Sequence, residues 1–242
     1  MSQTCLKLEN VSKRFRILQS ETTVLRLIKN LLSGRSLRKE FWALKDISFE
    51  IKKGEKVALI GKNGSGKTTL LRIISGIYDK TSGQIETNDA PRALFKFCTG
   101  LNTHLFIIDN IYLFGALHGM EKKFLKERLE EIIGMAEIGH LRYAPLKDLS
   151  AGQTQRLAMS AFFQVTGDFY IFDESLAFVD SSFIHKCKNY FDRLFSSSKT
   201  VIMASHDSSF LKKYCNRALW FKEGILHMDG PAREVIELYE RS

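Results

Sequence analysis

The chain has 242 residues, of which 44% are hydrophobic and 26% are charged, and 36 Lys and Arg against 27 Asp and Glu give it a net charge of +9. This composition is typical of a folded globular protein and excludes disordered and collagen-like chains. No apolar run approaches the roughly 18 to 20 residues of a membrane-spanning helix. The first residues lack a basic segment followed by an apolar one, so we expect no export signal and a cytosolic location.

Cysteine spacing and charge distribution narrow the protein class further. Cys5, Cys98, Cys187 and Cys215 form no C-x-x-C pair, so we expect four reduced thiols rather than a zinc ribbon or a disulfide framework. Residues 11–45 hold nine Lys and Arg against two Glu. Such a basic patch suits nucleic acid, an acidic lipid surface or a phosphorylated substrate, and a solvated face without a partner fits equally well.

The first part of the chain predicts strands, a basic helix and a glycine-rich turn. Alternation of apolar and polar residues over 6–11 and 47–51 predicts two half-buried antiparallel strands. Between them, apolar residues at helical spacing predict a short amphipathic basic helix over 24–32. The run 56–60, in which four apolar residues follow Lys56, predicts a buried strand that leads through glycines into a helix over 69–74.

The rest of the chain predicts a helical insertion and then a return to α/β alternation. The stretch from about 92 to 154 is mainly helical in pattern. Residues 169–172 and 200–204 predict core strands, and 189–195 predict part of the helix between them.

The residues from Gly61 to Thr68 fit the pattern G-x-x-x-x-G-K-[ST]. Glycines let backbone N–H groups surround phosphate oxygens, the lysine adds positive charge, and the threonine hydroxyl ligates Mg²⁺. An ordinary glycine-rich turn is the alternative, but the strand before and the helix after favour a phosphate-binding loop.

Two acids, Asp173 and Glu174, end a predicted buried strand about a hundred residues later. Such a strand places Asp173 beside the phosphate loop, where it can hold Mg²⁺. Glu174 can then act as the general base that activates water. By themselves the two acids would fit a helix start equally well.

Two further segments have both an ordinary and a functional interpretation. Ser150, with Gln153 three residues later, fits a helix capping box; the free N–H groups of this helix start also suit a γ-phosphate. His206 follows a predicted core strand, and a lone histidine is most often a surface residue, yet at this sheet edge it can bond a γ-phosphate. The other histidines show no ligand spacing, so we assign no transition metal.

Together, the ordered set of Gly61–Thr68, Leu149–Gln153, Asp173-Glu174, Asp180 and His206 resembles the ATP-binding-cassette ATPase domain over nearly the whole chain. The resemblance implies one α/β domain over 1–242: a P-loop NTPase with a RecA-like core, an antiparallel β subdomain and an inserted helical subdomain at about 94–154. It also implies a head-to-tail homodimer, with ATP between the phosphate loop of one chain and the signature loop of the other.

The resemblance implies ATP and Mg²⁺ as cofactors and assigns roles to individual residues. Thr68 and Asp173 would hold the metal, Glu174 would activate water and His206 would sense the γ-phosphate. Phe15 would stack on adenine, with Phe41 or Trp42 as alternatives. The implied ATP-binding positions are Gly61, Lys62, Asn63, Gly64, Ser65, Gly66, Lys67, Thr68, Thr69, Phe15, Ser150 and Gly152.

A narrower resemblance is to the ATPases that export lipid-linked polysaccharides such as capsule, O-antigen and teichoic acid. It is carried by the basic insertion after Phe15, by Gly100-Leu101-Asn102 with Asp109-Asn110-Ile111-Tyr112, and by the segment 173–187, which is similar to D-E-x-L-A-V-G-D-x-x-F-x-x-K-C. The F-x-x-K-C part also fits a helix with Phe183 and Cys187 packed in the core. The resemblance implies an integral membrane permease as partner, a lipid-linked glycan as substrate and a peripheral position on the cytoplasmic face of the cell membrane.

The sequence departs from the family pattern at the metal-ligating glutamine, since no Gln occurs between Gln84 and Gln153 and Lys96 falls near that position. A soluble ABC ATPase acting on nucleic acid or ribosomes is the alternative function, although the chain has neither a second cassette nor a long coiled coil, so nucleic acid is not the expected partner. A nucleotide-gated adaptor with little hydrolysis is a third. The basic helix at 24–32 would contact lipid head groups or a substrate pyrophosphate, and we expect no separate C-terminal sugar-binding domain.

Overall fold

The computed structural model describes residues 3–18, 38–95, 100–173 and 181–242. The predicted basic helix at 24–32, Lys96, Glu174 and Asp180 therefore lie outside the described residues. Among those that are described, no helix combines the length and the apolar character needed to cross a membrane.

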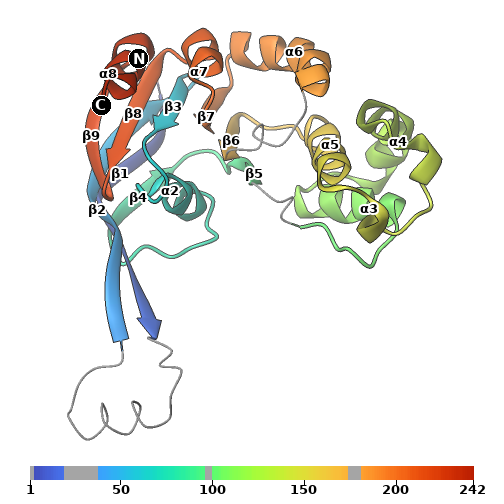
Figure 1. The fold of residues 1–242 in the computed structure, drawn as a ribbon, viewed down its shortest axis with the longest axis horizontal. Helices are drawn as coiled ribbons and strands as arrows, with labels where there is room; N and C mark the ends of the chain where they lie inside the picture. Colours follow the sequence, from blue (N-terminus) through green and yellow to red (C-terminus); the bar gives the residue numbers. More distant parts are fainter. Residues whose placement is uncertain (1–2, 19–37, 96–99, 174–180) are drawn as a thin grey trace, which may run out of the picture.

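An antiparallel sheet is formed by β1 (Thr4–Leu18), β2 (Arg38–Lys52) and β4 (Ser82–Thr87), in the order β2-β1-β4. The two predicted strands thus pair as expected, but both are longer than the alternation indicated. Their far ends form a two-stranded ribbon that projects from the body of the protein (Figure 1).

A six-stranded sheet has the order β5-β6-β7-β3-β8-β9. Its strands are parallel apart from the antiparallel β9. The predicted core strands are confirmed, since every residue of β3, β6 and β7 is buried. Their bounds are β5 (Arg92–Phe95), β6 (Phe169–Asp173), β7 (Thr200–Ala204), β3 (Lys56–Ile60), β8 (Arg217–Lys222) and β9 (Ile225–Pro231).

Both faces of this sheet are covered, which explains why its central strands are mainly apolar. Val57 and Leu59 pack with the antiparallel sheet and α2 (Lys67–Ile74). Ala58 and Ile60 belong to the other core cluster. Helices α6 (Ser181–Ser196), α7 (Ser208–Tyr214) and α8 (Ala232–Glu240) contribute to this second cluster, and so do the helices between residues 107 and 162.

Three helices form a separate lobe beside the β5 edge of the sheet (Figure 1): α3 (Ile107–Leu117), α4 (Lys122–Ala136) and α5 (Ala151–Phe162). Short 3-10 turns lie at Gly139–Leu141 and Leu146–Asp148. The expected helical stretch from 92 to 154 is wrong at its start, because Arg92–Phe95 is a strand paired with β6; the helix predicted after Ser150 is confirmed as α5 and continues to Phe162. A short apolar run such as 92–95 cannot be assigned to strand or helix by periodicity alone.

The cysteines agree with the expectation of free thiols as far as they are described. Cys5, Cys187 and Cys215 are free and buried, and burial raises the pKa of the Cys215 thiol to about 12. Phe183 and Cys187 are fully buried, which confirms that this part of the F-x-x-K-C segment packs in the core.

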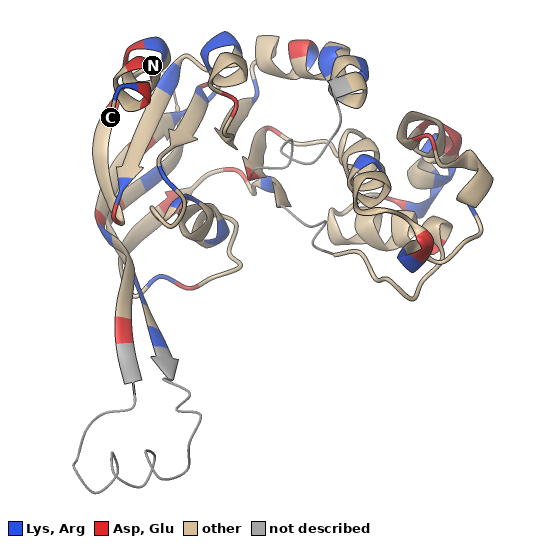
Figure 2. Ribbon diagram, in the orientation of Figure 1, with Lys and Arg blue, Asp and Glu red and all other residues tan. Residues whose placement is uncertain are grey.

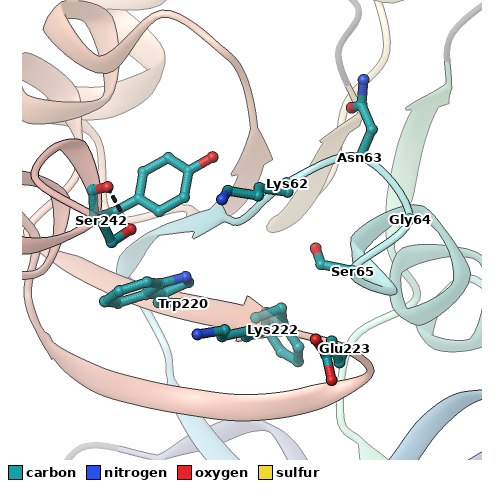
Figure 3. A pocket seen from close by; sticks show the side chains of 10 residues that line it. Lys62, Asn63, Gly64, Ser65, Trp220, Lys222, Glu223 and Ser242 are labelled. Atoms are coloured by element: carbon teal, nitrogen blue, oxygen red, sulfur yellow. Dashed lines mark hydrogen bonds between the residues drawn. The ribbon is translucent and has the colours of Figure 1, made fainter.

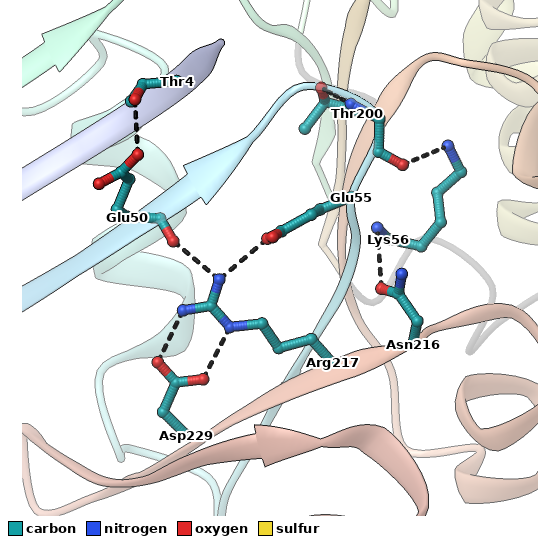
Figure 4. Close-up of polar contacts among 9 residues, drawn as sticks. Thr4, Glu50, Glu55, Lys56, Thr200, Asn216, Arg217 and Asp229 are labelled. Atoms are coloured by element: carbon teal, nitrogen blue, oxygen red, sulfur yellow. Dashed lines mark hydrogen bonds and ion pairs between the residues drawn. The ribbon is translucent and has the colours of Figure 1, made fainter. Parts of the chain in front are cut away.

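The guanidinium of Arg217 joins both sheets at the end opposite the phosphate loop (Figure 4). It donates two hydrogen bonds to Asp229 at 2.7 Å and one to Glu55 at 2.9 Å. A further bond reaches the Glu50 carbonyl of β2 at 2.8 Å. Removal of this side chain would leave two half-buried carboxylates without their cation.

We therefore expect Arg217→Met to lower the free energy of unfolding by about 2 kcal/mol, the range of charged hydrogen bonds in a partly buried network. Arg217→Lys should keep only part of the stabilisation that Arg217 provides, because an ammonium cannot bind a carboxylate through two parallel bonds. Urea unfolding followed by circular dichroism measures both, with the exposed Arg233→Met on α8 as control. Equal stability of the Arg217 and Arg233 variants would contradict the role given to Arg217.

His118 joins the helical lobe to the sheet. Its ring lies 4.5 Å from that of Phe114 and 5.5 Å from that of Phe162, measured between centroids. Its carbonyl accepts a bond from Arg92 of β5 at 3.1 Å. Burial, and secondarily the charge of Arg92, lowers the pKa of His118 from 6.5 to about 4.

This lowered pKa predicts that the folded state loses stability in acid. His118 stays neutral in the folded chain, whereas the unfolded chain binds a proton below pH 6.5. The contribution of neutral His118 to the free energy of unfolding is therefore complete above that pH and is lost as the pH falls toward 4. His118→Leu should make the free energy of unfolding less dependent on pH across this window. Exposed His185→Leu is the control, and parallel pH profiles for wild type and His118→Leu would contradict the assignment.

Candidate functional site

The phosphate loop predicted from Gly61 to Thr68 connects β3 directly to α2. Its outer side is fixed to the turn between β8 and β9, because the Gly224 N–H donates to the Ser65 carbonyl at 3.1 Å. Within the loop the Ser65 N–H donates to the Lys62 carbonyl at 3.1 Å. The loop is therefore held from outside by the sheet.

Two of its glycines are required by close approach as well as by backbone conformation. Gly61 has φ +143° and a side-chain Cβ there would lie 2.2 Å from the Phe221 carbonyl oxygen. Gly66 has φ +107°, and its Cβ would lie 2.7 Å from the Ala43 carbonyl oxygen. By contrast, Gly64 has φ +81° with open space around it.

Lys67 and Ser65 provide the polar groups of the loop. The Lys67 ammonium is buried and donates to the carbonyls of Gly61 at 2.6 Å and Lys62 at 3.2 Å. The Ser65 hydroxyl is buried without a hydrogen-bond partner among the described residues. The Lys67 ammonium, which bonds carbonyls of its own loop, and the Ser65 hydroxyl, which has no partner among the described residues, fit a loop that binds an oxyanion.

The second motif meets the first at Thr68. The Thr68 hydroxyl donates to a carboxylate oxygen of Asp173 at 3.2 Å, and Asp173 is buried at the last position of β6. A hydroxyl and a buried carboxylate are oxygen ligands of the kind Mg²⁺ prefers, so the residues present fit that metal. Thr69 is the next residue of α2, and no cluster of three or more His, Cys, Asp or Glu suited to a metal occurs in the described part of the chain.

Strand register brings His206 to the same edge. Asp173 pairs with Ala204 of β7, and Ala204 pairs with Leu59 of β3. His206 follows two residues after Ala204 and is exposed. The proposed base Glu174 directly follows Asp173 and lies outside the described residues.

Ser150 and Gly152 lie elsewhere, at the start of α5 in the helical lobe. The capping box is confirmed: the Ser150 hydroxyl accepts from the Gln153 N–H at 3.2 Å and its own N–H donates to the Gln153 side chain at 2.9 Å. Ser150 hydrogen-bonds only within its own helix among the described residues. This chain therefore does not bring Ser150 into hydrogen-bonding contact with its own phosphate loop.

The three aromatic residues considered for adenine lie on the projecting ribbon. Phe15 pairs in register with Phe41, and Arg14 with Trp42. The Phe15 ring makes an edge contact with Tyr78 at 5.7 Å between centroids. Phe41 and Trp42 are 49% and 39% exposed, so all three remain available and Phe15 stays the predicted stacking residue.

A cavity of about 310 Å³ lies between the phosphate loop and β8. Figure 3 shows Lys62 and Ser65 on one side of it and Trp220 and Lys222 of β8 on the other. The loop thus has an open flank toward β8 in addition to its contacts with Gly224.

Sequence reasoning did not identify Asn110 as a structural residue. Its side chain is fully buried and bonds four backbone groups of the preceding loop. It accepts from the Asn102 N–H at 2.7 Å and donates to the carbonyls of Asn102, Leu105 and Phe106 at 2.9 to 3.1 Å. The Asn102 and Asn110 spacing was visible as a motif, but its physical role required the folded loop.

The two glycine environments make a direct prediction. Gly61→Ala should weaken binding of a fluorescent ATP analogue at least about tenfold more than Gly64→Ala. Both variants place a side chain on a residue with positive φ, which is strained. Only the Cβ at position 61 would also lie against a backbone carbonyl, that of Phe221. Fluorescence titration measures the two affinities, and equal losses would contradict the tight packing of Gly61 against β8.

Comparisons with known proteins show which family the chain resembles. A family model described as "ABC transporter" matches residues 44–177. A Lactococcus lactis protein named teichoic acids export ATP-binding protein TagH is 33% identical over 98% of this chain, which spans only 50% of that protein's length. TagH of Listeria innocua is 34% identical over 96% of this chain and 68% of its own length. An O-antigen export system ATP-binding protein of Klebsiella pneumoniae is 35% identical over 88% of this chain and 85% of its own.

Solved structures agree at the level of fold. A dimeric ATP-binding cassette bound to ADP and Pi has a TM-score of 0.74 at 23% identity, over 94% of this chain and 99% of that one. CbiO1 of Clostridium perfringens has a TM-score of 0.65 at 24% identity, over 99% of this chain and 93% of that one. Because the family model matches more than half of the chain, and because the O-antigen export relative is 35% identical with 85% of its length covered, the chain belongs to the ABC transporter family.

Proposed function

We propose that the chain is the ATP-binding subunit of an exporter and hydrolyses ATP to move a lipid-linked polysaccharide across the cytoplasmic membrane. The observation that carries this proposal is the meeting of Lys67, Thr68 and Asp173 at one edge of the sheet. The capsule, O-antigen or teichoic-acid type of substrate is supported by the names of the TagH and O-antigen relatives.

ATP binding would use groups that the structure already brings together. Lys67 would turn from the carbonyls of Gly61 and Lys62 toward the phosphates, while loop N–H groups bind the oxygens. Thr68 and Asp173 would hold Mg²⁺, which neutralises phosphate charge when it is bound.

The hydrolytic roles belong to two residues at the carboxyl ends of β6 and β7. Glu174 would take a proton from the attacking water as general base. His206 would donate a hydrogen bond to the γ-phosphate, and its position next to the strand paired with Asp173 supports that role.

The position of Ser150 and Gly152 in the helical lobe supports a head-to-tail homodimer. Since Ser150 bonds only within its own helix among the described residues, a second chain would bring its α5 N-terminus to the phosphates. We also propose that the insertion at about 94–154 acts as the helical subdomain, and that an integral membrane permease holds the dimer at the cytoplasmic face of the membrane. In such a dimer, ATP favours the closed state and hydrolysis favours the open one.

Co-purification from native membranes in mild detergent tests the export part. We expect a partner with several membrane spans and ATP turnover that depends on Glu174. Recovery with RNA or ribosomes, without a membrane protein, would contradict export and favour the alternative of a soluble ABC ATPase acting on nucleic acid.

Two variants test the catalytic assignment. Glu174→Gln should lower turnover by about 10² to 10⁴ while ATP binding is kept, because only proton transfer is lost. Lys67→Ala should abolish binding as well, because the phosphates lose their cation. A coupled ATPase assay and equilibrium dialysis measure both, with the exposed Lys80→Ala as control. Full turnover by Glu174→Gln would exclude Glu174 as the base.

A further inference from the structure

One face of α6 meets the helical lobe at two points. Lys186 and Tyr190 are four residues apart and therefore lie on the same face of this helix. The Tyr190 ring stacks on Phe163, the residue that ends α5, with 3.8 Å between centroids. The Lys186 ammonium forms an ion pair with Glu137. Helix α6 thus touches the lobe through the rings of Tyr190 and Phe191, which both contact Phe163, and through the ion pair of Lys186.

Glu137 occupies a backbone position that normally favours glycine. It ends α4 with φ 59° and ψ 38°, the left-handed conformation. A glycine or asparagine adopts this conformation at a helix end with less strain than a glutamate. Such a conformation persists where the surrounding structure holds the residue, and here the Glu137 side chain is held by two ion pairs.

The Glu137 carboxylate bridges helices of the lobe and the core. Its second oxygen accepts from Arg156 of α5 at 2.7 Å. Arg156 lies on the helix that begins at Ser150, and Lys186 lies on the helix that follows the Asp173 strand and Glu174. One carboxylate therefore links the two helices that carry the two halves of the proposed ATP site.

The contact between lobe and core has space beside it. A groove of about 690 Å³ lies between α4 and α6, lined by residues that include Glu131, Met135, Lys186 and Tyr190. Basic and acidic residues are interspersed on both helices (Figure 2). Because both side chains of the ion pair are exposed, the pair can separate into solvent while the ring contacts with Phe163 are kept.

We propose that Lys186 and Glu137 form a releasable latch that sets the orientation of α5, and with it Ser150, relative to α6. Lys186 and Glu137 act here as positioning residues, not catalytic ones. The Tyr190 and Phe163 stack serves as the pivot and the ion pair as the contact that opens. This role explains the lysine of the F-x-x-K-C segment, which packing of Phe183 and Cys187 does not.

The exposure of the pair suits a contact that opens and closes. The side chains of Lys186 and Glu137 are 49% and 42% exposed, so solvent screens their attraction and the pair shifts an equilibrium by only about two- to fivefold. Arg156 is 18% exposed and stays with Glu137 on the lobe side. The bond that opens is therefore the one to Lys186.

Spin labels on the full chain test the latch without any use of hydrolysis. Labels at Lys126→Cys on α4 and Ser209→Cys on α7, with Cys98→Ser in the background, report the distance between lobe and core; the other three cysteines are buried. We expect one narrow distance distribution at low salt and a second, longer population in 1 M NaCl, where ionic attraction reaches only about 3 Å. Lys186→Met should show the longer population at low salt, and Lys186→Arg should not.

Glu137→Gly separates positioning from stability. Glycine relieves the left-handed backbone strain, so the melting temperature should stay the same or rise while the longer population appears. Lys188→Met, on the same helix, is the matched control and should match wild type. An unchanged distance distribution in both Lys186→Met and Glu137→Gly would overturn the latch, as would an equal effect of Lys188→Met.

Turnover provides the link to the proposed function, on which this part of the inference rests. If the latch keeps Ser150 in the competent orientation, Lys186→Met should raise the ATP concentration for half-maximal turnover about two- to fivefold and leave the maximal rate nearly unchanged. A kcat loss without a change in half-maximal concentration would contradict the positioning role. Absence of turnover in every variant, wild type included, would overturn the proposed hydrolysis while the distance measurements still decide the latch.

Discussion

The parallel pairing of β3, β6 and β7 is the constraint on which the site depends. Because β7 pairs with Asp173 on one side and with Leu59 on the other, three carboxyl strand ends meet at one edge. That edge receives the phosphate loop after Ile60, the carboxylate of Asp173 and the segment that carries His206. Rigid backbone ladders fix these positions, so the hydroxyl of Thr68 reaches Asp173 without help from any flexible segment.

The loop itself is shaped from outside. Gly224 of the β8–β9 turn donates to the Ser65 carbonyl, and the carbonyls of Phe221 and Ala43 lie where side chains at Gly61 and Gly66 would be. The glycine positions thus satisfy two demands: N–H groups must face the ligand on one side, and neighbouring strands must approach on the other. At the opposite end of the sheet, Arg217 ties the same strands to β2 through Glu50. Both ends of the sheet are braced by contacts with the antiparallel layer.

The helical lobe is attached more loosely than the core sheet is held together. His118 packs against Phe114 and Phe162 and connects the lobe to β5 through Arg92. On the far side, the rings of Tyr190 and Phe191 contact Phe163, and Lys186 of α6 forms an ion pair with Glu137. These are side-chain contacts, of which the exposed pair of Lys186 and Glu137 is the weakest, and buried rings such as Phe162 against Phe172 add to them. The strands of the sheet are joined by backbone hydrogen-bond ladders.

The sequence by itself determined the elements with strong local signals. Residue type and spacing predicted the strands β3, β6 and β7, the phosphate loop and the Ser150 capping box. Each of these features depends on neighbours only a few residues away. The assignment of Arg92–Phe95 to a strand, the bonds of Asn110 and the bridging role of Glu137 required the tertiary structure. Their partners lie on other elements of the fold, and sequence spacing carries no record of which distant side chains or carbonyls will meet.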